Sequence, residues 1–297
     1  MKTAVVICRR LARTLLLLAL VAVGTILLMR FAPGYFSDAR EMDAKYAQRE
    51  QAALHEEEAK SRSFGQVARG TFGGWLHGDL GASRQYGVPV SELVRPRLRV
   101  TALLLIQGVV FGWLLALCTA FPLSLWRNVR SMAGVPFTVL LAVPTGAMAT
   151  LCLLADTGGP VLVLTLLLAA RDFKFLQRLF RSAWSAPHVL QARAQGVRGD
   201  RLAAAHLLPN VAPQILALGT LSIVTALSAI VPIEVIFGVP GVGQLAWNAA
   251  MNRDLPVLLA ITLLMAAAVS CAGMIAPREL KVQTAWGAGL LYGCLPS

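Results

Sequence analysis

Long apolar runs separated by short polar stretches dominate this chain. Each run after the first is near the roughly 20 residues that a helix needs to cross the hydrocarbon core of a bilayer. The runs cover Leu15–Met29, Thr101–Leu125, Met132–Leu154, Pro160–Phe180, Ile215–Phe237 and Leu255–Ala276. This pattern predicts an all-α polytopic membrane protein with about six transmembrane helices. The fourth run is the weakest, because three charged residues interrupt it: Arg171, Asp172 and Lys174.

The polar stretches between the runs suggest how the chain is organised. A signal peptide is the alternative reading of the first run, but no small-x-small cleavage site follows it, so an uncleaved anchor helix is expected over residues 1–30. Helix formers fill much of the next stretch, which predicts a periplasmic loop region with short helices over 31–100. A transmembrane domain over 101–277 and a C-terminal tail over 278–297 complete the chain.

The charges of the short loops predict the orientation of the helices. Basic residues gather on the side of the N-terminus: Arg127, Arg130, those of 171–201, Arg278 and Lys281. The positive-inside rule therefore places both termini in the cytoplasm. The 31–100 region also carries Arg95, Arg97 and Arg99. At about 70 residues that region is too long for the rule to count, so its arginines do not change the prediction.

Composition excludes several classes of protein. The chain is 57% hydrophobic and 14% charged, whereas soluble domains carry about 25% charged residues. Its net charge of +12 does not indicate nucleic-acid binding, because the basic residues lie at the ends of apolar runs. Neither the cysteines nor the histidines show metal-ligand spacing. We expect no metal, no cofactor and no catalytic residues, since hydrolase motifs are also missing from the sequence.

One basic loop, residues 185–215, has the pattern of an ordered element. Ser185 is a suitable N-cap for a short helix that ends at Gly196, where glycine supplies a left-handed residue. A second helix is expected over Arg201–Leu208, with Pro209 breaking the path into the next span. The loop is expected on the cytoplasmic side, as helix, glycine corner and helix. Alternatively, its arginines simply lie against anionic lipid headgroups.

The same loop resembles the EAA loop of bacterial ABC-importer permeases. That loop has a glycine followed thirteen residues later by a proline, as Gly196 and Pro209 are here. The details are most similar to the dipeptide/oligopeptide/nickel permease family, in the following residues: Ala192, Arg193, Ala194, Gly196, His206, Leu208, Pro209 and Asn210. Leu190 departs from the general pattern, which has a glutamate at this position.

Two further stretches resemble the same family. One is the Gly-Asp-Leu-Gly-Ala-Ser segment at 78–83, followed by Pro89-Val90. The other runs from residue 234 to 243 and continues with Asn-Arg-Asp-Leu-Pro at 252–256. The resemblance covers about residues 70–270, and its three motifs occur in order within a six-helix layout.

The resemblance implies the MetI-like permease fold and a bacterial inner-membrane location. It implies a second homologous permease, two cytoplasmic ABC ATPases that hold the loop, and a periplasmic substrate-binding protein. The sequence has no phosphate-binding loop of its own, so ATP hydrolysis would belong to a partner chain. Short peptides are the family's default substrate, with nickel or an oligosaccharide left open. The alternative function is a secondary carrier or scaffold whose basic loop binds lipid headgroups.

Two interpretations remain open for the loop residues, and two for Glu234. The loop residues either couple transport to ATP hydrolysis or merely build an ordinary loop, and His206 either contacts the ATPase or satisfies a local carbonyl. Glu234 is the one acid noted well inside an apolar run, which makes it a candidate for a functional group. It also lies close to the end of its span, at Phe237-Gly238, and this placement favours a structural role, with the side chain able to reach water.

Overall fold

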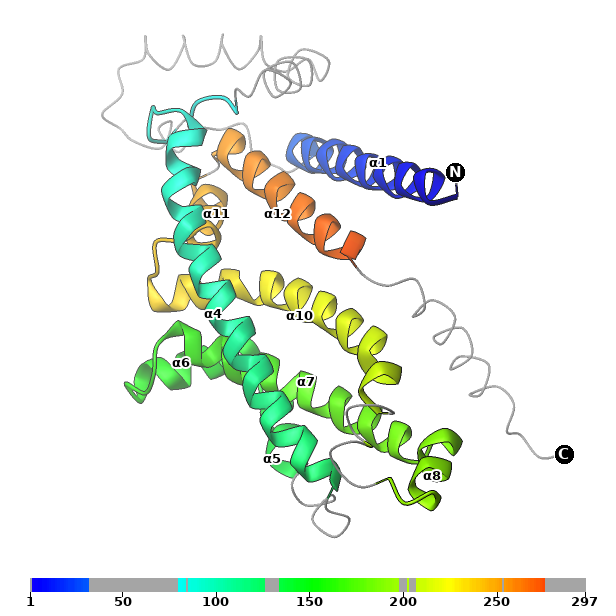
Figure 1. Cartoon of the computed structure of the whole chain (residues 1–297). Helices are drawn as coiled ribbons and strands as arrows, with labels where there is room; N and C mark the ends of the chain where they lie inside the picture. The colour runs from blue at the N-terminus through cyan, green and yellow to red at the C-terminus, as the bar shows by residue number, and fades with distance from the viewer. Residues whose placement is uncertain are drawn as a thin grey trace, which may run out of the picture. The chain divides into compact units, whose positions relative to one another are not determined.

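The computed structural model describes residues 2–31, 80–83, 85–125, 134–197, 202, 207–252 and 254–275. These residues are mostly helical, and they contain no strand beyond an isolated bridge between Ala82 and Pro89. The all-α class is therefore confirmed for the described part of the chain. Its helices (Figure 1) are α1 (Lys2–Phe31), α4 (Val90–Leu125), α5 (Val135–Ala142), α6 (Thr145–Leu154), α7 (Pro160–Trp184), α8 (Pro187–Ala194), α10 (Leu208–Phe237), α11 (Val242–Met251) and α12 (Leu255–Ile275).

Three of the described helices are long and apolar enough to cross a membrane on their own: Val90–Ser124, Leu208–Phe237 and Leu255–Met274. Helices α5 and α6 pass the same test only as a pair, and they are bent by 99° at the break between them. The expectation of one continuous helix over Met132–Leu154 is therefore wrong. Pro144 explains the break, because a proline drives the preceding residue out of the helical region, and Val143 is extended at φ −82° and ψ 124°.

Two helix starts also differ from the sequence prediction. Helix α4 begins at Val90, so Arg95, Arg97 and Arg99 lie on this helix and not in the preceding loop. Arginine is a good helix former, and an apolar run therefore underestimates the length of the helix. Helix α10 begins at Leu208, so Pro209 does not break the path into the span. It lies in the first turn, where the missing N–H costs no hydrogen bond.

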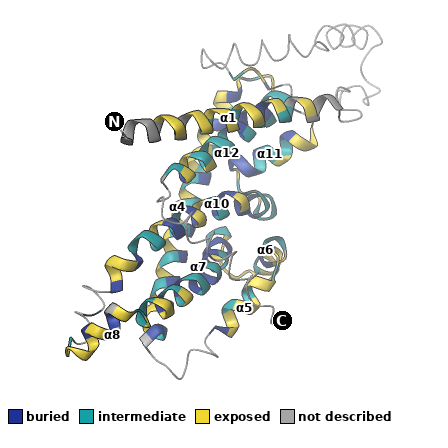
Figure 2. Cartoon of the chain, turned by 90° about the vertical axis from the view of Figure 1, so that its right-hand side faces the viewer, coloured by how far each residue is buried: buried dark blue, intermediate teal, exposed yellow. Residues whose placement is uncertain are grey.

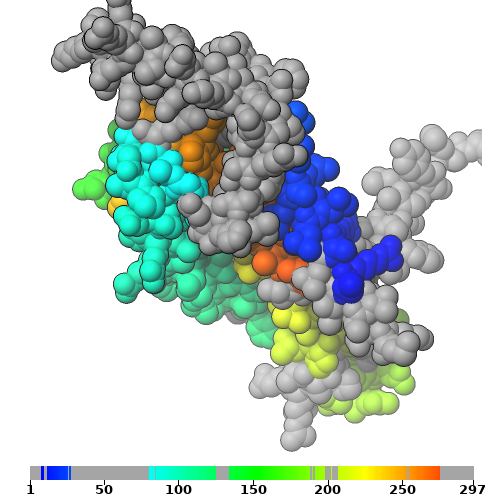
Figure 3. Space-filling model, turned by 90° about the horizontal axis from the view of Figure 1, so that it is seen from above, coloured from blue at the N-terminus to red at the C-terminus, as the bar shows by residue number. Residues whose placement is uncertain are grey.

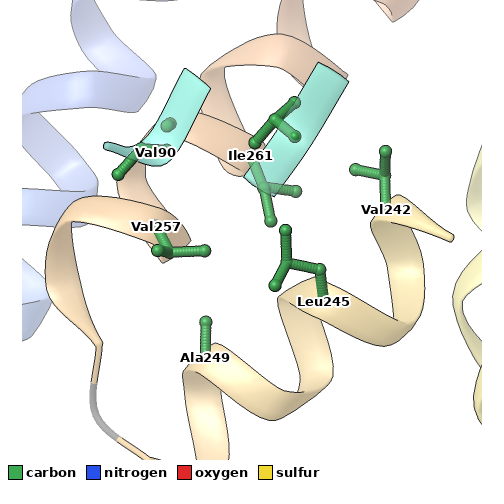
Figure 4. Packing of buried hydrophobic residues seen from close by; sticks show 8 residues of the cluster. Val90, Val242, Leu245, Ala249, Val257 and Ile261 are labelled. Carbon is green, nitrogen blue, oxygen red and sulfur yellow. The ribbon is translucent and has the colours of Figure 1, made fainter. Parts of the chain in front are cut away.

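The chain divides into two units. The first comprises residues up to Ala102 together with Gly238–Ser270, and the second comprises Leu103–Phe237 together with the chain from Cys271. In the first unit, α11 and α12 pack their apolar faces together with the start of α4. The labelled side chains converge in Figure 4, and the buried core consists of Val90, Val94, Val242, Leu245, Ala249, Val257, Ala260 and Ile261.

Helix α1 belongs to the first unit and packs on α12. Ala22 is buried against Leu259 and Leu263. In the space-filling view α1 (blue) lies beside the orange atoms of α12 (Figure 3). Its leucines at 15, 16 and 20 are exposed.

Helix α7 is the centre of the second unit. It contacts α5, α6, α8 and α10, and buried residues run along it (Figure 2). On α4, four small residues repeat at every fourth position and face α7: Gly108, Gly112, Ala116 and Ala120. Small residues let two helix backbones approach closely. Leu164 and Leu168 of α7 fill the space over the two glycines.

Gly112 tests the close approach of α4 and α7. A Cβ placed there would lie 2.9 Å from the Leu168 Cβ and 3.3 Å from the Thr165 carbonyl oxygen, neither of which can move without moving α7. We predict that Gly112→Ala destabilises the protein by about 1–3 kcal/mol, as overpacking does. Scanning fluorimetry in detergent measures the loss. Gly273→Ala is the control, because a Cβ at Gly273 meets nothing within 4 Å. An equal effect of both substitutions would contradict the predicted contact.

Candidate functional site

The loop helix α8 begins one residue later than the sequence suggested. Ala186 is its N-cap, with an extended backbone (φ −67°, ψ 139°), and Pro187 is its first residue. The expectation that Ser185 caps this helix is wrong. Ser185 ends α7 instead, where its Oγ donates to the carbonyl oxygens of Ser182 at 2.9 Å and Arg181 at 3.2 Å. The physical reason is Pro187, whose ring drives Ala186 into the extended conformation.

Gly196 ends α8 in the left-handed conformation, at φ +83°, as the sequence predicted. Two backbone hydrogen bonds complete a Schellman motif: Gly196 N donates to Arg193 O at 3.1 Å, and Val197 N donates to Ala192 O at 3.2 Å. Val197 also packs on the cluster that contains Ala192, which is the apolar contact that accompanies this motif. The corner after α8 is therefore fixed by the backbone itself.

A small apolar cluster packs against one face of α8, which we call its underside. Val189, Ala192 and Leu202 are buried in it, and Trp184, Ala186 and Val197 pack around them. This cluster decides which side of α8 is available to a partner, because residues on the opposite side stay exposed. Arg193 lies on that exposed side and is the only fixed charge among the described residues of the 185–215 loop.

The structure distributes the predicted coupling residues over three places. Ala192 lies in the buried cluster beneath α8, while Arg193, Ala194 and Gly196 are exposed on α8 and its corner. The exposed first turn of α10 contains the next three: Leu208, Pro209 and Asn210. His206 lies outside the described residues.

Helices α7 and α10 are joined by polar contacts that the sequence reasoning missed. Asp172 is fully buried on α7, and Ser222 Oγ of α10 donates to its Oδ2 at 2.7 Å. One residue earlier, Arg171 Nη1 donates to Thr225 Oγ1 and, at 3.1 Å, to Leu221 O. From the sequence, these charged residues were expected to interrupt a span and to mark its cytoplasmic side. The available signal was the set of hydroxyl residues on α10, Thr220, Ser222, Thr225 and Ser228.

Glu234 is buried on α10, with no exposed surface. The expectation that its carboxylate reaches water near Phe237 is therefore wrong for this chain. The helix continues to Phe237, and the residues around Glu234 enclose its side chain. Asp172 and Glu234 are thus two carboxylates in the interior of the second unit, where the sequence had indicated one.

In the first unit, Asp254 joins two segments that are far apart in the sequence. Its carboxylate is buried and accepts a hydrogen bond from Ser83 Oγ, 171 residues away in the chain. Gln85 N donates to Asp254 Oδ2 at 3.3 Å, and Tyr86 N donates to Ser83 Oγ at 3.0 Å. The turn is closed by Ser83 N, which donates to Val88 O at 2.9 Å. The two stretches that carried the family resemblance at the start of α4 and before α12 are therefore direct neighbours.

These arrangements offer hydrogen bonding and packing between helices. No group of three or more His, Cys, Asp or Glu side chains that could hold a metal ion occurs among the described residues. The polar residues that the structure does bring together act in pairs, each joining one helix or turn to another.

Several known membrane transport proteins are similar to this chain. Residues 108–278 match the family described as binding-protein-dependent transport system inner membrane component. The chain is 29% identical over 238 residues to the oligopeptide transport system permease protein AppB of Bacillus subtilis, covering 69% of this chain and 74% of AppB. It is 27% identical over 209 residues to the metal-staphylopine import system permease protein CntB of Staphylococcus aureus, covering 63% and 66%. With the glutathione transport system permease protein GsiC of Salmonella choleraesuis it shares 26% identity over 210 residues, covering 64% and 68%.

The Ser83–Asp254 contact can be measured by a double-mutant cycle. We predict that Ser83→Ala and Asp254→Ala each lower the free energy of unfolding by about 1–3 kcal/mol, as expected when a hydrogen bond to a buried charged group is lost. The double variant should lose little more than the worse single variant, because both remove the same contact. Ser228→Ala is the control, since the hydroxyl of this exposed serine donates to Val224 O of its own helix. Additive losses would show that the two residues act separately.

Proposed function

This chain belongs to the family of binding-protein-dependent transport system inner membrane components, and from that membership we propose that it carries short peptides across the bacterial inner membrane. It is the permease subunit of an ABC importer, and members of this family do not themselves hydrolyse ATP. Membership implies that ATPase and substrate-binding components work with it. Our proposal adds their arrangement: a second homologous permease, two cytoplasmic ATPases and a periplasmic binding protein.

The relatives' names support a peptide-like substrate. AppB is named for oligopeptides and GsiC for glutathione. CntB is named for a metal-staphylopine complex, so a metal chelate is the second candidate. Both candidates are small polar molecules that a binding protein delivers to the permease.

The exposed side of α8 supports the proposal that this helix docks on an ATPase. Its underside is occupied by the Val189, Ala192 and Leu202 cluster, and the Schellman corner at Gly196 fixes where the chain leaves it. A rigid bent element of this kind can bias a two-state equilibrium in the helices that it follows. The alternative, that the loop only binds lipid headgroups, uses Arg193 but assigns no role to the ordered corner.

We further propose six membrane crossings, by α1, α4, the α5–α6 pair, α7, α10 and α12, with both termini in the cytoplasm. The position of α5 relative to α7 supports one broken span. Gly134, just before α5, lies against Lys174 and Gln177, whereas only residues 155–159 separate the end of α6 from Pro160, where α7 begins. Pro160 and Lys174 are roughly 21 Å apart along α7 at 1.5 Å per residue, so the two ends of the pair lie at different depths.

Gly196 tests the function of the loop. We predict that Gly196→Val lowers peptide uptake at least about fivefold, the lower end of typical coupling effects, because a β-branched residue is strained at φ +83°. Gly196→Asn is the matched control, since asparagine tolerates the left-handed conformation. The tagged chain is co-expressed with candidate ATPase, second permease and binding-protein subunits from the same organism. Co-purification of the ATPases and uptake of radiolabelled tri-alanine are then measured.

Three outcomes contradict different parts of the proposed function. Unchanged co-purification and uptake in Gly196→Val would remove the loop's coupling role. Failure of the unmodified chain to co-purify with any ATPase would contradict the importer assignment. Uptake of a nickel chelate with no uptake of tri-alanine would contradict the peptide assignment alone.

Single cysteines in a cysteine-free background test the broken span. We predict that a membrane-impermeant maleimide labels Asp156→Cys in intact cells, but labels Val135→Cys and Gln195→Cys only after permeabilisation. All three positions are exposed. Labelling of Val135→Cys from outside, together with Asp156→Cys, would mean that α5 and α6 form a re-entrant loop.

A further inference from the structure

Trp184 lies where the cluster beneath α8 meets the core of the helices. It is the last residue of α7, and its partly buried ring packs on the Val189, Ala192 and Leu202 cluster. The same ring packs on the larger cluster that includes Phe180 and the buried alanines of α4. One side chain therefore contacts both the loop cluster and the helix core.

The indole also has a directed polar contact with α4. Trp184 Nε1 donates to Ser124 Oγ at 3.2 Å, next to the end of α4. Ser124 is buried, and its own hydroxyl donates to Phe121 O at 2.6 Å. The hydroxyl proton points at that carbonyl, so a lone pair of Ser124 Oγ faces the indole.

A second contact one turn away supports the same pairing of α4 and α7. The rings of Phe121 and Phe180 pack edge to face, with centroids 5.9 Å apart and an interplanar angle of 80°. Residues 180 and 184 of α7 thus meet residues 121 and 124 of α4. The final turns of the two helices are joined by one aromatic contact and one hydrogen bond.

The connection between α7 and α8 is short and hydrogen-bonded. Only Ser185 and Ala186 separate the helices, and Ala186 N donates to Ala183 O at 3.2 Å. Ser185 Oγ bonds back to the last turn of α7. A displacement of α8 therefore reaches Trp184 through the chain and through the packed cluster.

From these contacts we infer that Trp184 and Ser124 form a positioning pair that transmits displacement of α8 to the end of α4. This inference rests on the proposed function, because it presumes that α8 is displaced by an ATPase. The pair touches neither substrate nor nucleotide. It acts by making the end of α4 follow α8.

The test compares the ratio of binding-protein-stimulated to basal ATP hydrolysis in the complete complex, reconstituted in lipid nanodiscs with tri-alanine-loaded binding protein. Trp184→Phe keeps an aromatic ring and removes the Nε1 donor, and Ser124→Ala removes the acceptor. Each should lower the ratio by about threefold to tenfold, the range expected for one lost hydrogen bond. The double variant should fall no further than the worse single variant. The matched control is Trp247→Phe, at an exposed tryptophan of α11.

The outcomes separate this inference from the proposed function. Unchanged ratios in both single variants would overturn the positioning pair, even if Gly196→Val abolishes coupling. Equal falls in basal and stimulated hydrolysis would overturn it too, since a purely structural loss leaves the ratio unchanged. A fall in the ratio with Trp247→Phe as large as with Trp184→Phe would also overturn it. Absence of ATP hydrolysis in the unmodified complex would contradict the proposed function itself.

Discussion

The close approach of α4 and α7 is the contact on which the second unit depends. At Gly112, a single added carbon would meet the Leu168 side chain and the α7 backbone. Helix α7 also contacts α5, α6, α8 and α10. The least apolar of the long helices is thus central to this unit, and its Arg171 and Asp172 are hydrogen-bonded to α10.

Polar contacts in this protein join segments that are far apart in the chain. Asp172 with Ser222 joins α7 to α10, and Ser83 with Asp254 joins the turn before α4 to the start of α12. In surroundings of low dielectric constant, a buried carboxylate without a donor is costly. Such pairs therefore select one packing of the helices among the many that apolar surfaces alone would allow.

Helix α8 receives its orientation from the same core. The cluster beneath it shares Trp184 with the core of α4, α7 and α10, so the loop that matches the importer family is built on the helices and not merely attached to them. An element with an ordered corner, an occupied underside and an exposed arginine suits a permease that responds to a partner's movement. The family match assigns the permease function, and the loop geometry is compatible with the coupling role that we propose for it.

The sequence alone determined the features that depend on local chemistry. Hydropathy located the apolar helices, Gly196 predicted its left-handed corner, and the loop motif identified the family. Two local effects of proline were missed: Pro144 divides one predicted span, and Pro187 makes Ala186 the cap of α8. Only the tertiary structure decided the rest, including that Glu234 is enclosed instead of reaching water. The partners of Asp172 and Asp254 lie 50 and 171 residues away. No local pattern specifies such pairings, because they exist only once the helices have packed.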